Sequence, residues 1–346
     1  MSDEHTRILI VKLSSFGDVL HALPTLEALR DLYPQGRLTW LVEAAYAPVL
    51  EQHPALDQVW RGPRLRPGQF FSGANPALLA GLVRHLRALP FDVVIDLQGL
   101  LKSAVWVALA QSPRKVGYDR TREWSYRVLS ERVAPFDPEA HAVHRYLNLA
   151  HYLGAPITPP RFRLALGAET QVYHLLPAGA TRGLAVLHPG ARWPSKLWAA
   201  AAWARLADWL SREHGLRVVF TGAVADQGLV AAILSQTQEP VISLAGRTTL
   251  PELAAVLRRA RLAVTTDTGA MHLAAALGTR TVALFGPTAP WRTGPFGEGH
   301  EVVRLGLDCS PCFKRRCREP RCLTDLAPEL VQEACEKILF PLEING

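Results

Sequence analysis

The chain has 346 residues, which is enough for two domains of ordinary size. Hydrophobic residues make up 49% of it and charged residues 20%, a composition that excludes an intrinsically disordered protein. The net charge of +7 at pH 7 favours acidic ligands such as nucleotide phosphates, anionic lipid head groups or nucleic acids. No apolar run approaches the roughly 20 residues that span a bilayer, and the polar start does not resemble a signal peptide, so we expect a cytoplasmic protein.

Strand-like and helix-like segments alternate through the first half of the chain. Strands are predicted at 7–12, 37–42 and 91–96, and helices at 19–32, 76–88 and 141–153. Strands separated by helices indicate a parallel, doubly wound sheet. A loop-like stretch at 154–169 then predicts a boundary between domains 1–160 and 161–346.

The second half predicts another series of strands and helices. Strands are expected at 184–188, 217–221, 241–244, 262–266 and 281–285, and helices at 196–214, 225–236, 249–259 and 270–277. Two Rossmann-like domains that are joined once and face a ligand cleft form the α/β arrangement known as GT-B. We expect a last helix, at 328–339, to pack back across the domain boundary.

The turn after the first strand is the most informative stretch. Lys12-Leu-Ser-Ser-Phe-Gly-Asp18 consists of a strand end, a turn of small residues and a carboxylate at the start of a helix. Ligands of open α/β sheets bind at this carboxyl edge. Asp18 is therefore a candidate for catalysis. The alternative is an aspartate that caps the helix and stabilises it by about 1 kcal/mol.

Two strand ends of the second half carry candidate anion sites. Thr268 and Gly269 open a helix after Asp267, and its free N–H groups attract anions, with His272 one turn further on. The alternative is a capped helix in which the histidine is merely packed. After another strand end, Lys196 can neutralise charge on a departing diphosphate. Its alternative is a solvated lysine in the first turn of a helix, which the helix dipole disfavours.

A third strand end leads to Asp226, which can accept hydrogen bonds from ribose hydroxyls or serve as a simple first-turn acid. Basic side chains also gather in the first domain. They are Arg61, Arg64, Arg66, Lys102, Arg120 and Arg122. Arginine can hold carboxylates and phosphates through two hydrogen bonds, and the alternative for each residue is ordinary solvated charge. The same charges favour contact with an anionic membrane surface.

Four of the five cysteines lie close together in the sequence, at Cys309, Cys312, Cys317 and Cys322. In a reducing compartment such a cluster favours metal over disulfides, and four thiolates can hold a structural zinc ion. The alternative is four reduced thiols on a basic loop. A zinc ion with four protein ligands has no open position for a substrate, so it would not be catalytic.

Several of these stretches resemble glycosyltransferase family 9, the ADP-heptose:lipopolysaccharide heptosyltransferases. The similar blocks are 11–24, 92–104, 141–145, 267–272 and 285–288, so the resemblance extends over nearly the whole chain. The N-terminal blocks are most similar to the heptosyltransferase I branch, whereas the four cysteines are more typical of heptosyltransferase II. The resemblance identifies the chain as a GT-B glycosyltransferase.

The resemblance implies transfer of heptose, with inversion, from ADP-heptose to Kdo or an inner-core heptose. Asp18 would be the general base and Lys196 would steady the phosphates. The remaining donor-binding residues would be Gly190, Ala191, Asp226, Asp267, Thr268, Gly269 and His272. The acceptor, of Kdo-lipid A type, would be bound at the inner leaflet by Ser14 and Ser15 together with the basic residues named above. No cofactor is implied for catalysis, no nucleic acid is expected as a partner, and we expect a monomer.

Two other functions fit the same architecture. A nucleotide-sugar epimerase would use the donor alone, and it gives no role to Asp18 or to a basic acceptor site. A non-catalytic nucleotide-binding protein would suit the positive charge, but we find no recognisable nucleic-acid module. A dinucleotide oxidoreductase is disfavoured because no GxGxxG motif follows the first strand.

Overall fold

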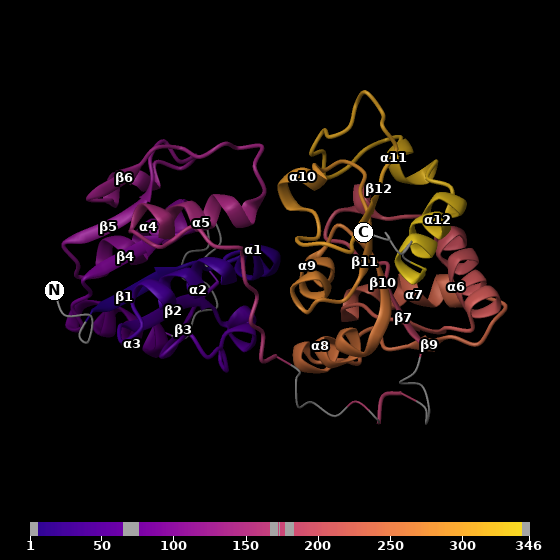
Figure 1. The fold of residues 1–346 in the computed structure, drawn as a ribbon, viewed down its shortest axis with the longest axis horizontal. Coiled ribbons are helices and arrows are strands. Elements are labelled where there is room, and N and C mark those ends of the chain that lie inside the picture. The colour runs from indigo at the N-terminus through magenta and orange to yellow at the C-terminus, as the bar shows by residue number, and fades with distance from the viewer. Residues whose placement is uncertain (1–5, 65–75, 167–171, 173, 177–182, 341–346) are drawn as a thin grey trace, which may run out of the picture. The chain divides into compact units, whose positions relative to one another are not determined.

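The protein divides into two compact units, Met1–Ala165 and Leu166–Gly346, in the computed structural model shown in Figure 1. The structure describes residues 6–64, 76–166, 172, 174–176 and 183–340. The boundary lies five residues after the expected end of the first domain at residue 160. Ion pairs hold residues 161–163 to the first unit and so explain the later boundary. Arg161 pairs with Asp31, and the Nε of Arg163 donates to Glu27 over 2.7 Å.

The first unit contains a six-stranded parallel sheet in the order β3-β2-β1-β4-β5-β6. The strands are β1 (Arg7–Val11), β2 (Arg37–Glu43), β3 (Gln58–Gly62), β4 (Val93–Asp96), β5 (Arg114–Tyr118) and β6 (Glu131–Val133). The helices are α1 (Phe16–His21), α2 (Leu23–Leu32), α3 (Pro76–Ala88), α4 (Leu101–Leu109) and α5 (Ala142–Tyr152). Helices cover both faces, which explains why β1 is a continuous apolar run.

Side chains alternate between the two faces of this sheet. Leu9 and Val11 share a core with Trp106 of α4 and with apolar residues of α3. On the other face α5 packs against α1 and α2. The expected helix 19–32 is two helices, because the chain turns at Ala22 and α2 begins with Pro24 in its first turn. The expectation missed the strands β3, β5 and β6, and it read the start of α4 as part of a turn.

The second unit repeats this topology, with strands in the order β12-β11-β10-β7-β8-β9. Its strands are β7 (Leu184–His188), β8 (Arg217–Phe220), β9 (Ile242–Ser243), β10 (Ala260–Thr266), β11 (Thr281–Leu284) and β12 (Glu301–Val303). Its helices are α6 (Ala200–His214), α7 (Gln227–Leu234), α8 (Leu250–Arg259), α9 (Gly269–Ala276), α10 (Pro290–Thr293), α11 (Arg321–Thr324) and α12 (Pro328–Leu339). The five expected strands and the doubly wound fold are confirmed, and the strand β12 and the short helices α10 and α11 were missed.

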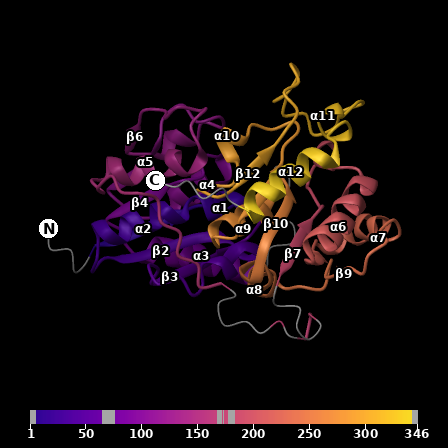
Figure 2. The same ribbon diagram turned by 45° about the vertical axis from the view of Figure 1, so that its right-hand side comes forward.

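The helix α12 packs inside the second unit, against α6 and the strands β10 to β12 (Figure 2). Its apolar side Val331, Cys335 and Ile338 completes the core of the second sheet. Among the described residues, no helix is long and apolar enough to span a membrane.

Each sheet has one point at which the strand order reverses. In the first unit it lies between β1 and β4, and in the second between β7 and β10. Doubly wound folds bind their ligands beside such a point, at the carboxyl edge of the sheet, because the loops that follow the two strands lead in opposite directions. The candidate residues Asp18, Gly190 and Asp267 all lie in loops or helix starts that follow these strands.

Candidate functional site

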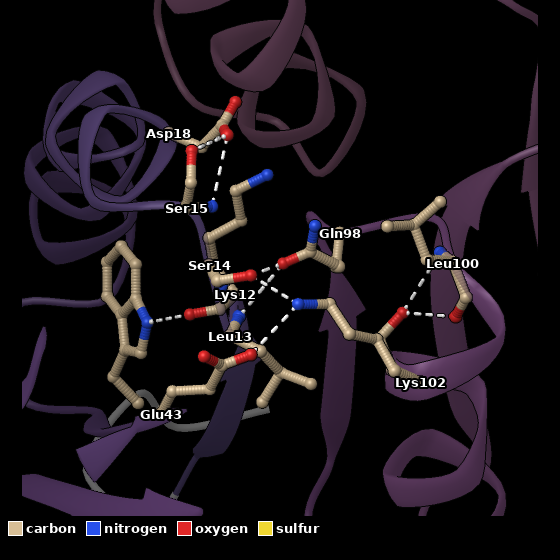
Figure 3. Close-up of polar contacts among 11 residues, drawn as sticks. Lys12, Leu13, Ser14, Ser15, Asp18, Glu43, Gln98, Leu100 and Lys102 are labelled. Atoms are coloured by element: carbon tan, nitrogen blue, oxygen red, sulfur yellow. Dashed lines mark hydrogen bonds and ion pairs between the residues drawn. The ribbon is translucent and has the colours of Figure 1, made fainter. Parts of the chain in front are cut away.

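Asp18 lies in the first turn of α1, and its side chain is half-buried. Its Oδ2 accepts two hydrogen bonds from Ser15, from the backbone N–H over 3.1 Å and from the hydroxyl over 2.7 Å (Figure 3). This is a capping box in which Ser15 is the N-cap residue and Asp18 the third residue of the helix, so Asp18 takes part in the cap but is not itself the N-cap residue. The other oxygen, Oδ1, accepts a hydrogen bond from the hydroxyl of Tyr146 on α5 over 2.9 Å.

A buried lysine, Lys12, is linked to Asp18 through Tyr146. The ammonium group of Lys12 donates to the hydroxyl of Tyr146 over 2.7 Å and to the carbonyl of Leu97 over 3.1 Å. Burial lowers the pKa of Lys12 to about 8, although Asp18 and Asp96 oppose the shift. Burial also raises the pKa of Asp18, but the charge of Lys12 and the hydrogen bonds of Ser15 outweigh it and leave that pKa well below its usual value. Asp18 is therefore ionised at neutral pH.

A second polar group supports the turn at residues 13–15. The side-chain oxygen of Gln98, after β4, accepts from the backbone N–H groups of Leu13 and Ser14 over 3.1 and 3.0 Å. Lys102 of α4 donates to the hydroxyl of Ser14 and to the buried carboxylate of Glu43, the latter over 2.9 Å (Figure 3). The charge of Lys102 is thus already balanced inside the protein. Neither Gln98 nor Glu43 was singled out from the sequence.

The basic residues predicted to bind an acceptor do not form one cluster. Arg61 on β3 pairs with Glu51, and Arg64 lies just beyond the same strand, whereas Arg120 and Arg122 follow β5 and are exposed. In the order of the sheet, β2, β1 and β4 lie between these two strands, a separation of roughly 19 Å at the usual strand spacing. The two pairs therefore flank the turn of Asp18 at the carboxyl edge. Arg66 lies outside the described residues.

In the second unit, two predicted residues form an ion pair. The ammonium group of Lys196 lies 2.5 Å from Oδ2 of Asp267, and the hydroxyl of Thr288 donates to the same oxygen over 2.6 Å. The ring of Trp193 lies 4.5 Å from this ammonium group. Lys196 occupies a short 3₁₀ helix, Pro194–Lys196, so it is not in the first turn of α6 as expected, and the dipole argument does not apply to it. The ammonium group retains donor capacity toward a ligand.

Asp226 lies against the loop that follows β7. Its Oδ2 accepts from the N–H of Ala223 over 2.8 Å, and a Cβ on Gly190 would lie 2.5 Å from its carboxyl carbon. The glycine therefore lets this carboxylate approach the backbone. His188, at the end of β7, is buried, and burial lowers its pKa to about 4, so that it is neutral at pH 7.

The third predicted group surrounds the start of α9. Thr268 is its N-cap residue, but its side chain accepts no hydrogen bond from the described first turn, and Gly269 opens the helix. Because that turn lacks a side-chain cap, its N–H groups can receive an anion. His272 is half-buried on the same helix, and Ala191 lies in the loop after β7. These residues meet because β7 and β10 are neighbours.

The structure does not support a zinc site at the four cysteines. All four are among the described residues, and no three His, Cys, Asp or Glu side chains in that part of the chain are arranged to hold a metal ion. Cys309 and Cys317 are exposed, and the sulfur of Cys317 is directed at the carbonyl of Glu319 over 3.3 Å. Burial and the neighbouring Cys312, Cys309 and Cys317 raise the pKa of Cys322.

Comparison with known families identifies relatives of the chain. The family model of glycosyltransferase family 9 (heptosyltransferase) matches residues 79–323. The chain is 33% identical to lipopolysaccharide heptosyltransferase 1 of Pseudomonas aeruginosa, over 97% of this chain and 99% of that protein. It is 28% identical to lipopolysaccharide heptosyltransferase 2 of Escherichia coli K12, over 97% and 99%.

Solved structures give the same result. Escherichia coli heptosyltransferase WaaC with ADP has a TM-score of 0.77 and 26% identity, covering 96% of this chain and 100% of that one. A glycosyltransferase of family 9 from Veillonella parvula has a TM-score of 0.80 over 98% of both chains, at 24% identity. The second of these likenesses concerns the fold alone.

Proposed function

Because the chain belongs to glycosyltransferase family 9, the heptosyltransferases, we propose that it transfers heptose from ADP-heptose to a sugar of the lipopolysaccharide core. Its similarity to lipopolysaccharide heptosyltransferases over nearly the full length of both chains supports this activity. A family 9 structure carries ADP-2-deoxy-2-fluoro heptose, at 27% identity and over 96% of this chain, which supports ADP-heptose as the donor. For the acceptor we propose Kdo of a Kdo-lipid A type molecule. Over most of the chain, identity to the heptosyltransferase 1 proteins of Pseudomonas aeruginosa and Escherichia coli K12 is 33% and 31%, against 28% to heptosyltransferase 2 of Escherichia coli K12.

The proposed reaction is a single displacement with inversion. Asp18 removes the proton of the acceptor hydroxyl while that oxygen forms a bond to the anomeric carbon of heptose. The bond from this carbon to the phosphate oxygen breaks, and ADP leaves with the electron pair. Lys196 and the N-terminus of α9 stabilise the charge that develops on the diphosphate. Asp267 accepts hydrogen bonds from the heptose, and Asp226 from the ribose.

The observation that carries this mechanism is the environment of Asp18. It is ionised, it lies at the reversal point of the first sheet, and its Oδ1 accepts only one hydrogen bond among the described residues. The test is release of ADP from ADP-heptose with and without Kdo-lipid A. The transferase must require the acceptor, and product analysis must find heptose attached to it with inverted configuration. Release of ADP at the same rate without acceptor would contradict the proposal.

The contact between Gly190 and Asp226 gives a prediction about donor binding. Gly190→Ala places a methyl group against the carboxylate and must displace it. We expect the KM for ADP-heptose to rise roughly tenfold or more, the effect of losing a hydrogen bond to a charged group. The control is Gly228→Ala on α7, where an added Cβ meets nothing within 4 Å. It should leave KM unchanged, and equal KM values in both variants would remove Asp226 from the donor site.

The proposed use of Lys196 and a helix N-terminus predicts that catalysis does not depend on a divalent metal. Both groups supply positive charge at the diphosphate, the task that Mg²⁺ performs in many nucleotide-sugar enzymes. Incubation with EDTA should therefore leave the initial transfer rate unchanged. The measurement is the rate before and after chelation, followed by addition of Mg²⁺ or Mn²⁺. Immediate loss of activity that either ion restores would contradict this mechanism.

A further inference from the structure

The hydrogen bonds of Asp18 distinguish its two oxygens. A carboxylate oxygen offers about two lone-pair directions. Oδ2 accepts from both the N–H and the hydroxyl of Ser15, so its capacity is used. Within the described part of the chain, Oδ1 accepts from Tyr146 alone and keeps one direction open. If Asp18 is the base, the proton of the acceptor therefore goes to Oδ1.

The proton of Tyr146 has a fixed direction. Its hydroxyl accepts a hydrogen bond from the ammonium group of Lys12 over 2.7 Å, so its own proton is free to donate to Asp18 over 2.9 Å. Burial and the nearby charge of Asp18 raise the pKa of Tyr146 well above its usual value, which keeps the phenol protonated. Lys12 is held in turn by the carbonyl of Leu97. The three side chains form one chain of donors that ends at the candidate base.

We propose that Tyr146 is a positioning residue for the base. Its hydroxyl, held by the ammonium group of Lys12, fixes Oδ1 of Asp18 and leaves one lone pair of that oxygen for the acceptor hydroxyl. This inference rests on the proposed role of Asp18 as base. Neither Tyr146 nor Lys12 needs to touch the acceptor, because both act through Asp18.

The same arrangement makes turnover depend on pH on the alkaline side. The charged groups that face Lys12 are Asp18 and, from three other elements, Asp96, Lys102 and Arg145; His21 also acts on Asp18. Above about pH 8, Lys12 loses its proton. The neutral amine can then accept the proton of Tyr146 and turn the hydroxyl away from Asp18. Turnover in the wild-type enzyme should therefore fall with a midpoint near pH 8.

The test is Tyr146→Phe, assayed for kcat and KM from pH 4 to pH 9.5. We expect kcat at pH 7 to fall about tenfold, the effect of losing one hydrogen bond to a charged group, with KM for ADP-heptose unchanged. The fall near pH 8 should disappear, since Lys12 no longer acts through a hydroxyl.

A matched control lies against the same helix. The hydroxyl of Tyr118 donates to the carbonyl of Arg145 and accepts from Asn148, both on α5, but it does not contact Asp18. Tyr118→Phe should keep the wild-type profile. If the two variants give the same kcat and the same profile while Asp18→Asn is inactive, the positioning role is wrong and the base assignment stands. If Asp18→Asn is active, the base assignment itself fails.

Folding of each variant is checked by its thermal unfolding. Should Tyr146→Phe fail to fold, the wild-type profile tests the proposal by itself. A kcat that stays flat to pH 9.5 would overturn it, because Lys12 must then have no influence on the base.

Discussion

Asp18→Asn is expected to reduce kcat by roughly 10²–10⁴-fold, the usual effect of losing a general base. The amide has nearly the same shape as the carboxylate but is far too weakly basic to take the proton of the acceptor. ADP binding should stay nearly intact, because the residues proposed to hold the nucleotide belong to the second unit. The measurements are steady-state turnover with saturating acceptor and calorimetric titration with ADP.

The control for this variant is Asp137→Asn. Asp137 is an exposed aspartate of the same unit, and its Oδ1 accepts a local backbone hydrogen bond from Glu139 over 2.9 Å. It thus tests loss of a carboxylate that accepts a local backbone hydrogen bond without touching the candidate site. Asp137→Asn should keep normal turnover. Near-normal turnover in Asp18→Asn would show that another group takes the proton.

Lys196→Met is expected to reduce kcat by about 10²–10³-fold, the effect of removing one charge-stabilising donor from a transition state. The substitution also leaves Asp267, whose side chain is only 7% exposed, without its ionic partner. Breaking a buried pair on one side destabilises a protein by roughly 3–5 kcal/mol. We therefore expect a lower midpoint of thermal unfolding together with the loss of turnover.

A double variant separates these two effects. Lys196→Met with Asp267→Asn removes both charges, so much of the lost stability should return, as a double-mutant cycle would show. Turnover should stay low, because the charge that faces the diphosphate is still missing. If turnover returned along with stability, Lys196 would be a structural residue only.

The sequence located candidates at strand ends but not the contacts between them. Asp18 and Lys196 were found because small residues and charges that follow a buried strand mark the carboxyl edge of a sheet. The pairing of Lys196 with Asp267 could not be found this way, since the two are 71 residues apart and meet only because β7 lies beside β10. The ion pair between Lys102 and Glu43 likewise joins residues 59 apart.

Tyr146 was missed for a different reason. It lies inside an amphipathic helix, where an aromatic residue is most often part of the core, and its partner Asp18 is 128 residues away. A contact between residues so far apart in the sequence leaves no local sequence pattern by which it could be predicted. Short strands were missed for a related reason. The strand β6 has three residues, which is too few for an alternation of apolar and polar positions to be recognised.

Each unit encloses its own sheet between its own helices, with separate hydrophobic cores. A substitution that alters the turn around Asp18 therefore has little mechanical effect on the nucleotide loops, and the reverse is equally true. Under selection, preference for the accepting sugar can drift while recognition of the activated sugar is retained. Hybrids that exchange whole halves between relatives are the natural way to exploit this modularity.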